Sequence, residues 1–239
     1  MKTKEEEIKN LTSELQSTQA TLQTKQEEVE TLTQEINFKV ESFCNLTFKP
    51  SHHIIRRSND VTRILKKLEE LHNESKGAIS TIYLSGIPGC GKSQIARQVG
   101  QEVYDKSLRE DEGLTFVSTL NAETLDSLAD SYFNLAKQLG VTEYTLTNLA
   151  TSTKVDSSEK IQHLMRFISP KVKQFSAWLI IVDNVVDLSE VRSYLPPTAS
   201  EEWGHGQVIV TTQILSQYLS IPLRLIMSLS VKECTQMMQ

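Results

Sequence analysis

The chain has 239 residues, of which 38% are hydrophobic, and a formal net charge of -5. This length suffices for one sizeable packed domain with an appendage, and the acidic balance argues against a broad electrostatic contact with nucleic acid or an anionic membrane. Three cysteines without a CxxC spacing predict neither a disulfide framework nor a zinc site. The N-terminus is charged and no run of about 18 apolar residues occurs, so we expect a cytoplasmic protein.

Residues 1–45 have the composition of a helix, because they contain no glycine or proline and are rich in Glu, Lys, Gln, Thr and Leu. A seven-residue repeat of apolar side chains predicts one coiled-coil seam: Ile8, Leu15, Leu22, Val29, Ile36 and Phe43. The second seam mixes apolar and polar residues: Leu11, Thr18, Lys25, Leu32 and Lys39. We therefore expect weak self-association or pairing with a protein partner. The alternative is a solitary amphipathic helix that packs on the globular domain or frays in solvent.

The segment 46–78 comes after the heptad repeat and leads into the globular core. Residues 58–72 carry apolar side chains at helical spacing behind a cap at Ser58 or Asn59, so we predict a helix that packs on the core. His52 and His53 are adjacent and have no accompanying ligand set, which argues against a metal site there.

From residue 79 to residue 239, short apolar runs alternate with helical patterns. Continuous aliphatic and β-branched runs are typical of strands that are buried on both faces. Five segments have this character: 78–86, 114–120, 178–183, 207–212 and 223–229. They predict a three-layer α/β sandwich with a mainly parallel five-stranded sheet. Helices are expected over 122–140 and 157–175, with a polar loop over 147–156 between them and Pro170 kinking or ending the second.

A glycine-rich stretch between the first of these strands and the next helix fits the pattern G-x-x-x-x-G-K-[ST]. Glycines let backbone N–H groups curl around an oxyanion, and the following helix points its positive dipole end at the same spot. The predicted phosphate-binding loop consists of Gly86, Ile87, Pro88, Gly89, Cys90, Gly91, Lys92, Ser93 and Gln94. We expect Lys92 to reach the β- and γ-phosphates and the Ser93 hydroxyl to bind Mg²⁺. The strand and helix context argues against a chance glycine-rich turn.

A carboxylate at the carboxyl end of a buried strand can orient the water shell of a metal beside such a loop. Asp183 ends the run 178–183 and is the candidate, which makes Lys92 and Asp183 the predicted catalytic pair of a P-loop NTPase. The alternative is an ordinary aspartate at a strand end. Thr153–Asp156 spells the guanine-recognition tetrad TKVD, but it precedes this strand instead of following a later one. The predicted ligands are therefore ATP and ADP.

Six segments, taken in order, resemble the nucleotide-binding module of NB-ARC proteins: IIRRSNDVTRILKKL, IYLSGIPGCGKSQIA, LTFVSTLNAETLDSLADSYFNLAKQLG, WLIIVDNVVDLSEVRSYLPP, GQVIVTTQ and MSLSVKEC. These STAND signal-transduction ATPases include apoptotic protease-activating factors and plant disease-resistance proteins. The resemblance covers about residues 52–239. It implies a switch of innate-immune or cell-death type, in which ADP holds the closed form and ATP permits assembly.

The resemblance also implies further site residues. It places the VIVTT strand between the Asp183 strand and the phosphate-loop strand, with Thr211 and Thr212 beside the nucleotide. Gln213 stands where the family often has a sensor arginine. The segment Ile54–Arg57 resembles a peptide that contacts adenine through its backbone, with Ile55 and Arg56 as the expected contacts, although Arg56 replaces the family's glycine.

Asn184 occupies the position of a second acidic residue that orients the attacking water in the family. An amide cannot accept a proton as a carboxylate does, so we expect a weak ATPase at most, unless Asp187 or another residue substitutes. Gln213 brings no charge to the γ-phosphate, which also predicts weak hydrolysis.

The chain stops shortly after a capping-box pattern, Ser230 to Glu233, which predicts the start of a helix. The family's later subdomains are absent, so the resemblance implies a fragment or a reduced form. Two other functions stay open: a small P-loop ATPase or kinase with a conventional substrate, and a coiled-coil scaffold with a degenerate nucleotide site. Arg166 and Arg192 stand alone, which argues against the Arg-rich acceptor site of a kinase.

Overall fold

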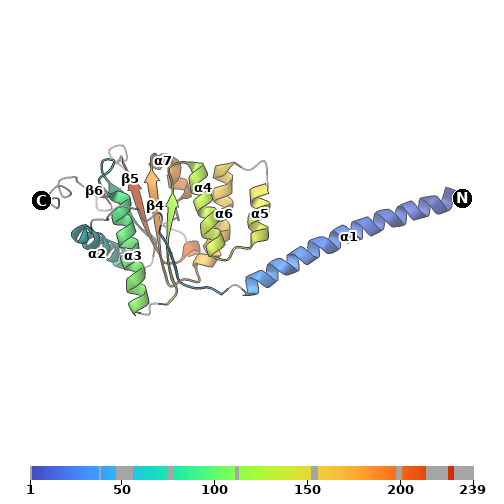
Figure 1. The fold of residues 1–239 in the computed structure, drawn as a ribbon, viewed down its shortest axis with the longest axis horizontal. Helices are drawn as coiled ribbons and strands as arrows, with labels where there is room; N and C mark the ends of the chain where they lie inside the picture. Colours follow the sequence, from blue (N-terminus) through green and yellow to red (C-terminus); the bar gives the residue numbers. More distant parts are fainter. Residues whose placement is uncertain are drawn as a thin grey trace.

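The computed structural model describes residues 2–37, 39–46, 56–74, 78–110, 113–151, 156–197, 201–213 and 226–228. A parallel six-stranded sheet forms its centre, in the order β1-β3-β4-β5-β2-β6, and helices cover both of its faces (Figure 1). The strands are β1 (Phe43–Asn45), β2 (Ser80–Ser85), β3 (Thr115–Asn121), β4 (Ala177–Val185), β5 (Gln207–Thr212) and β6 (Ile226–Ser228). The predicted three-layer sandwich is confirmed, as are all five predicted strands.

Two sets of helices make the outer layers. One face of the sheet carries α2 (Ser58–Glu74) and α3 (Lys92–Glu110), and the other carries α4 (Leu125–Gln138), α6 (Ser157–Val172) and the short α7 (Leu188–Val191). The remaining elements are α1 (Lys2–Asn37), α5 (Glu143–Thr151) and the 3₁₀ turns Arg192–Tyr194 and Glu201–Trp203.

The sheet is buried on both faces because its apolar side chains alternate between the two helix layers. The side toward α2 and α3 receives Ile82, Val117, Leu179, Ile181 and Ile209. The side toward α4 and α6 receives Phe116, Leu120, Ile180, Val182 and Val208. A strand that must satisfy both layers reads as a continuous apolar run, which is why the sequence pattern identified these strands.

The first strand differs from the prediction for residues 1–45. Helix α1 ends at Asn37, and Phe43, which the heptad pattern placed in a coiled-coil seam, lies in β1. Its ring stacks on Phe116 of β3 with 5.1 Å between ring centroids. Pairing with β3 and burial of this aromatic ring prevail over the heptad spacing. Lys39 also lies beyond the helix and pairs with Glu41 at 2.9 Å.

The predicted loop over 147–156 was wrong at its beginning, because α5 occupies Glu143–Thr151. Its sequence contains three Thr and one Asn, which are poor helix formers, and burial of Leu146 supplies the tertiary contact that favours the helix. At the other end of the connection, Asp156 caps α6 by accepting a hydrogen bond from the Glu159 amide at 2.8 Å. Helix α6 continues through Pro170 and ends at Val172.

Helix α1 extends away from the sandwich (Figure 1). Four of its seam residues, Leu11, Leu15, Leu22 and Val29, are 60 or 61% exposed. The side chains of Ile8, Leu32 and Ile36 lie outside the described part of the structure, as do residues 230–233. Across the residues that the structure describes, no helix combines the length and apolar character needed to cross a membrane.

Candidate nucleotide-binding site

The predicted phosphate loop connects the carboxyl end of β2 to the first residue of α3. Gly89 and Gly91 have φ angles of 76° and 91°, a left-handed region that glycine adopts without the cost a side chain would impose. The Ile95 amide donates to the Gly91 carbonyl at 2.9 Å, which closes the first turn of α3 directly on the loop. The positive end of this helix therefore faces the loop, as an anion site requires.

Lys92 places its charge inside this loop. Its ammonium group donates to the carbonyl oxygens of Gly86 at 2.8 Å and Ile87 at 3.0 Å, and its side chain is largely buried. Cys90 is buried as well, with its sulfur 3.9 Å from the same nitrogen. The loop thus holds the Lys92 ammonium against its own backbone, where the positive charge can meet a bound phosphate.

Three side-chain oxygens meet beside the loop. Ser93 Oγ and Thr211 Oγ1 both donate to Asp183 Oδ1, at 2.8 Å and 2.5 Å. The sheet order explains this meeting, because β5 lies between β4 and β2, so Thr211 stands next to Asp183. A carboxylate and two hydroxyl groups are hard oxygen donors of the kind that Mg²⁺ prefers. The described ranges hold no cluster of three or more His, Cys, Asp or Glu side chains suited to a metal.

Asn184 follows Asp183 in a left-handed conformation, with φ of 64°. Asparagine tolerates this region better than most residues. The Asn184 amide donates to Thr211 Oγ1 at 3.1 Å, and its side chain donates to Asn121 Oδ1 at 3.4 Å. The Asn184 side chain is thus turned toward the end of β3.

The remaining predicted residues fall into two groups. Thr212 is buried at the end of β5, in register with Ser85 just before the loop, and Gln213 follows it on the surface. The Arg56 side chain is 81% exposed and pairs with Glu102 of α3 at 3.3 Å, so it turns away from the loop. Its expected backbone contact with adenine stays a prediction, and Ile55 lies outside the described residues.

Sequence reasoning placed Arg57 in the segment expected to contact adenine but missed the contact of its side chain with the phosphate loop. Its Nη1 donates to the carbonyl oxygen of Cys90 at 2.9 Å, and its Nη2 lies 2.6 Å from Asp60 Oδ2. The signal available in the sequence was an Arg three residues before an Asp in a first helical turn, a spacing that permits an ion pair. That spacing does not reveal the loop as a further partner. Within the loop's own helix, Gln94 Oε1 is buried without a hydrogen-bond partner in the described part of the chain.

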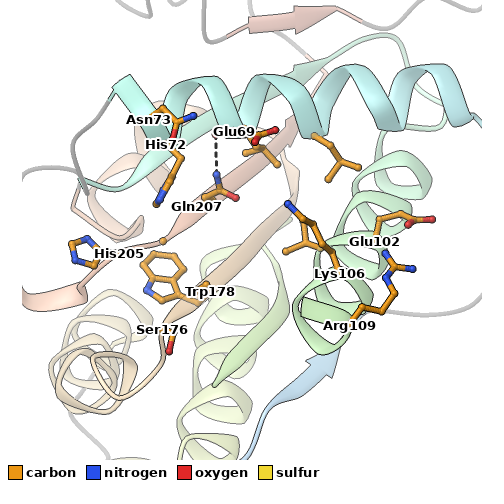
Figure 2. Close-up of a pocket in the computed structure, with 15 residues that line it drawn as sticks. Glu69, His72, Asn73, Glu102, Lys106, Arg109, Ser176, Trp178, His205 and Gln207 are labelled. Carbon is orange, nitrogen blue, oxygen red and sulfur yellow. Dashed lines mark hydrogen bonds between the residues drawn. The ribbon is translucent and has the colours of Figure 1, made fainter. Parts of the chain in front are cut away.

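A cavity of about 550 Å³ lies between α2 and α3 at the opposite edge of the sheet, where β4 and β5 begin (Figure 2). Trp178 and Gln207 line it from the strands, and Gln207 Nε2 donates to the Leu68 carbonyl at 3.0 Å. Charges of both signs surround it: Glu69, Glu102, Lys106 and Arg109. The C-terminal halves of both helices line this cavity, so neither helix directs the positive end of its dipole at it. The phosphate loop is therefore the better candidate site.

No protein-family model and no curated protein matches the chain. The chain matches in part the ORC1 protein of Aeropyrum pernix in complex with DNA, with 14% identity, a TM-score of 0.47, and coverage of 74% of this chain and 46% of that one. A second match is Drosophila ORC bound to DNA, with 17% identity, a TM-score of 0.47, and coverage of 77% and 44%.

A third match is the ORC2 protein of Aeropyrum pernix in ADPNP-ADP complexes, with 13% identity, a TM-score of 0.46, and coverage of 77% and 49%. The chain spans about half the length of these structures or slightly less. The sheet order, the glycine-rich loop and the helix that follows it define the fold of this chain as a three-layer P-loop NTPase sandwich.

Proposed function

We propose that the chain binds ATP and ADP together with Mg²⁺ at the loop of residues 86–94. The observation that carries the proposal is the position of the Lys92 ammonium within the loop, beside the oxygens of Ser93, Asp183 and Thr211. A bound polyphosphate would accept hydrogen bonds from Lys92 and from the first amides of α3. Ser93 and Asp183 would hold Mg²⁺, which supplies positive charge against the terminal phosphates.

Adenine is the proposed nucleobase because Asp156, the one described residue of the guanine-type TKVD tetrad, has another role. Asp156 accepts hydrogen bonds from the Glu159 amide at 2.8 Å and from Ser158 Oγ at 2.6 Å. These bonds favour the ionised carboxylate, and the pKa of Asp156 is lowered, chiefly by the Glu159 amide. The carboxylate that would read guanine thus serves as a helix cap, while residues 153–155 lie outside the described part.

Slow turnover is the second element of the proposal. Asn184 donates its side-chain amide to Asn121, and an amide cannot act as a general base. Asp187, the nearest possible substitute in sequence, caps α7 and accepts from the Ser189 amide at 2.8 Å and from Ser189 Oγ at 2.6 Å. Because neither Asn184 nor Asp187 is placed to act as a base, a site that retains the phosphate loop fits a nucleotide-dependent switch or assembly module better than a housekeeping ATPase.

Helix α1 is proposed as the arm of this module. It extends from the sandwich with the described side chains of its apolar seam exposed, and such a seam can associate weakly with itself or with a protein partner. The NB-ARC resemblance supports the switch. The innate-immune or cell-death setting rests on that resemblance alone, so the proposal is limited to nucleotide-dependent switching.

The test is a calorimetric titration of the full chain with ATP in the presence of Mg²⁺. Lys92→Ala should weaken binding by at least about tenfold, since charged hydrogen bonds are lost. Lys106→Ala is the matched control, because it removes a lysine from the same helix at the cavity on the opposite edge. Equal affinity of Lys92→Ala and wild type would refute the site.

A further inference from the structure

The first turn of α2 contacts the phosphate loop through a buried ion pair. Arg57 and Asp60 have side chains only 10% and 9% exposed, with 2.6 Å between Nη2 and Oδ2. The other terminal nitrogen of Arg57 donates to the Cys90 carbonyl in the loop at 2.9 Å. The Arg57 amide also donates to Gln98 Oε1 of α3 at 3.2 Å, so this turn is fixed to both the loop and its helix.

This contact determines how one peptide group of the loop is oriented. In a planar trans peptide, the carbonyl and the N–H of the next residue point in opposite directions. When Arg57 holds the Cys90 carbonyl, the Gly91 N–H must point away from Arg57, in the opposite direction within the same peptide plane. Gly91 has a φ of 91° and no side chain to restrict it, so without an anchor this peptide group could rotate at little cost.

We propose that Arg57 is a positioning residue for the phosphate loop. With Asp60 it fixes the peptide between Cys90 and Gly91 so that the Gly91 N–H is presented to a phosphate oxygen. The inference rests on the proposed nucleotide binding and adds its regulation, because the affinity of the loop then depends on how the first turn of α2 is seated.

The geometry of the guanidinium explains why arginine is needed. Its planar fork donates from two nitrogens at once, to a carbonyl on one side and a carboxylate on the other. A lysine at the same position keeps the charge and can satisfy one partner well, but not both in this arrangement. Arg57→Lys is therefore expected to recover part of the function that Arg57→Ala loses.

The experiment measures amide hydrogen exchange of the full chain without nucleotide, together with ATP affinity. In Arg57→Ala, we expect the amides of residues 86–93 to exchange at least about tenfold faster, because the loop loses a buried charged hydrogen bond. The amides of β4 should keep their wild-type rates. The Kd for ATP should rise by about tenfold, and Arg57→Lys should give intermediate values of both quantities.

Two arginines serve as matched controls. Arg56 precedes Arg57 but is exposed and pairs with Glu102. Arg63 is half exposed, and its Nη2 lies 3.2 Å from Oδ1 of Asp60, the residue that also pairs with Arg57. Arg56→Ala and Arg63→Ala should leave loop exchange within about twofold of wild type, as surface substitutions usually do. If either accelerates it as much as Arg57→Ala, the specific role of Arg57 is refuted.

Two further results would overturn the proposal. One is unchanged exchange of the loop in Arg57→Ala. The other is equal acceleration in the loop and in β4, which would mean that the ion pair stabilises the whole domain and does not position the loop. Failure of the proposed function is distinguishable. If the wild-type chain binds no ATP while Arg57→Ala still accelerates exchange in the loop alone, nucleotide binding is refuted and the anchoring role of Arg57 stands.

Discussion

The two edges of the sheet meet opposite ends of the same helix. At the carboxyl edge, α3 begins at Lys92 behind a loop with two left-handed glycines, and its positive end faces a set of side-chain oxygens. At the amino edge, α3 and α2 end beside a cavity with charges of both signs (Figure 2). The cavity is sizeable, but the direction of the helix dipoles favours an anion only at the loop. The orientation of backbone groups, not cavity volume, therefore locates the candidate site.

The largest effect is expected from a substitution at the amino edge, and it is an effect on the stability of the fold. A Cβ on Gly206 would lie 1.9 Å from Cε2 of Trp178, a buried indole whose Nε1 donates to the Trp203 carbonyl at 2.9 Å. Gly206→Ala should lower the free energy of unfolding by about 3 kcal/mol, since the rigid ring cannot move aside. Denaturant unfolding checks this. An unchanged midpoint would show that the amino edge is loosely packed.

The matching substitution at the carboxyl edge should affect affinity instead. In Gly91→Ala, the added Cβ meets nothing closer than 3.7 Å, at Arg57 Nη1, so it causes no clash. A side chain at φ of 91° strains the backbone by roughly 1–3 kcal/mol. The loop relieves this strain by leaving its phosphate-binding conformation. The Kd for ATP should rise by about tenfold or more. Isothermal calorimetry on wild type and variant decides between this outcome and an unaffected site.

Asn184→Asp should have a moderate effect, confined to turnover. A carboxylate beside Asp183 can act as a general base, a contribution of about 100- to 10,000-fold in favourable geometry. We expect a smaller increase here, because the new side chain must leave the direction of Asn121 to meet water. Phosphate release under single-turnover conditions measures the rate. Wild-type turnover in the ordinary enzyme range, about 1 to 1000 per second, would instead favour the ATPase or kinase alternative.

The smallest effect is expected from α1, which belongs to neither edge. Lys25 is exposed and occupies a seam position, so Lys25→Leu should strengthen self-association by removing a charge from the seam. The affinity for ATP should not change. Analytical ultracentrifugation of the full chain tests the first statement, and a titration with ATP tests the second. A purely monomeric Lys25→Leu variant would indicate that the heptad spacing in α1 does not support pairing.

The sequence predicted those parts of the molecule in which local pattern and tertiary role agree. The loop was recognisable because glycines, Lys92 and the start of a helix are adjacent in the chain, and Asp183 because a buried strand precedes it. Strand β1 was missed because it has only three residues, too few to carry a recognisable pattern. It is the outermost strand of the sheet and forms by pairing with β3. The contact of the Arg57 side chain with the loop was missed because its partner Cys90 is distant in sequence. Contacts of this kind depend on how α2 packs on α3, which no local pattern contains.

Hydrogen exchange of the wild-type chain with and without ATP and Mg²⁺ tests the central claim most directly, because it reports on both edges in one experiment. The account predicts slower exchange at residues 86–94 and at the carboxyl ends of β4 and β5, around Asp183 and Thr211, with unchanged exchange around Trp178, Lys106 and His205. Protection at the amino-edge cavity without protection of the loop would contradict the account, as would the absence of any protection at saturating ATP.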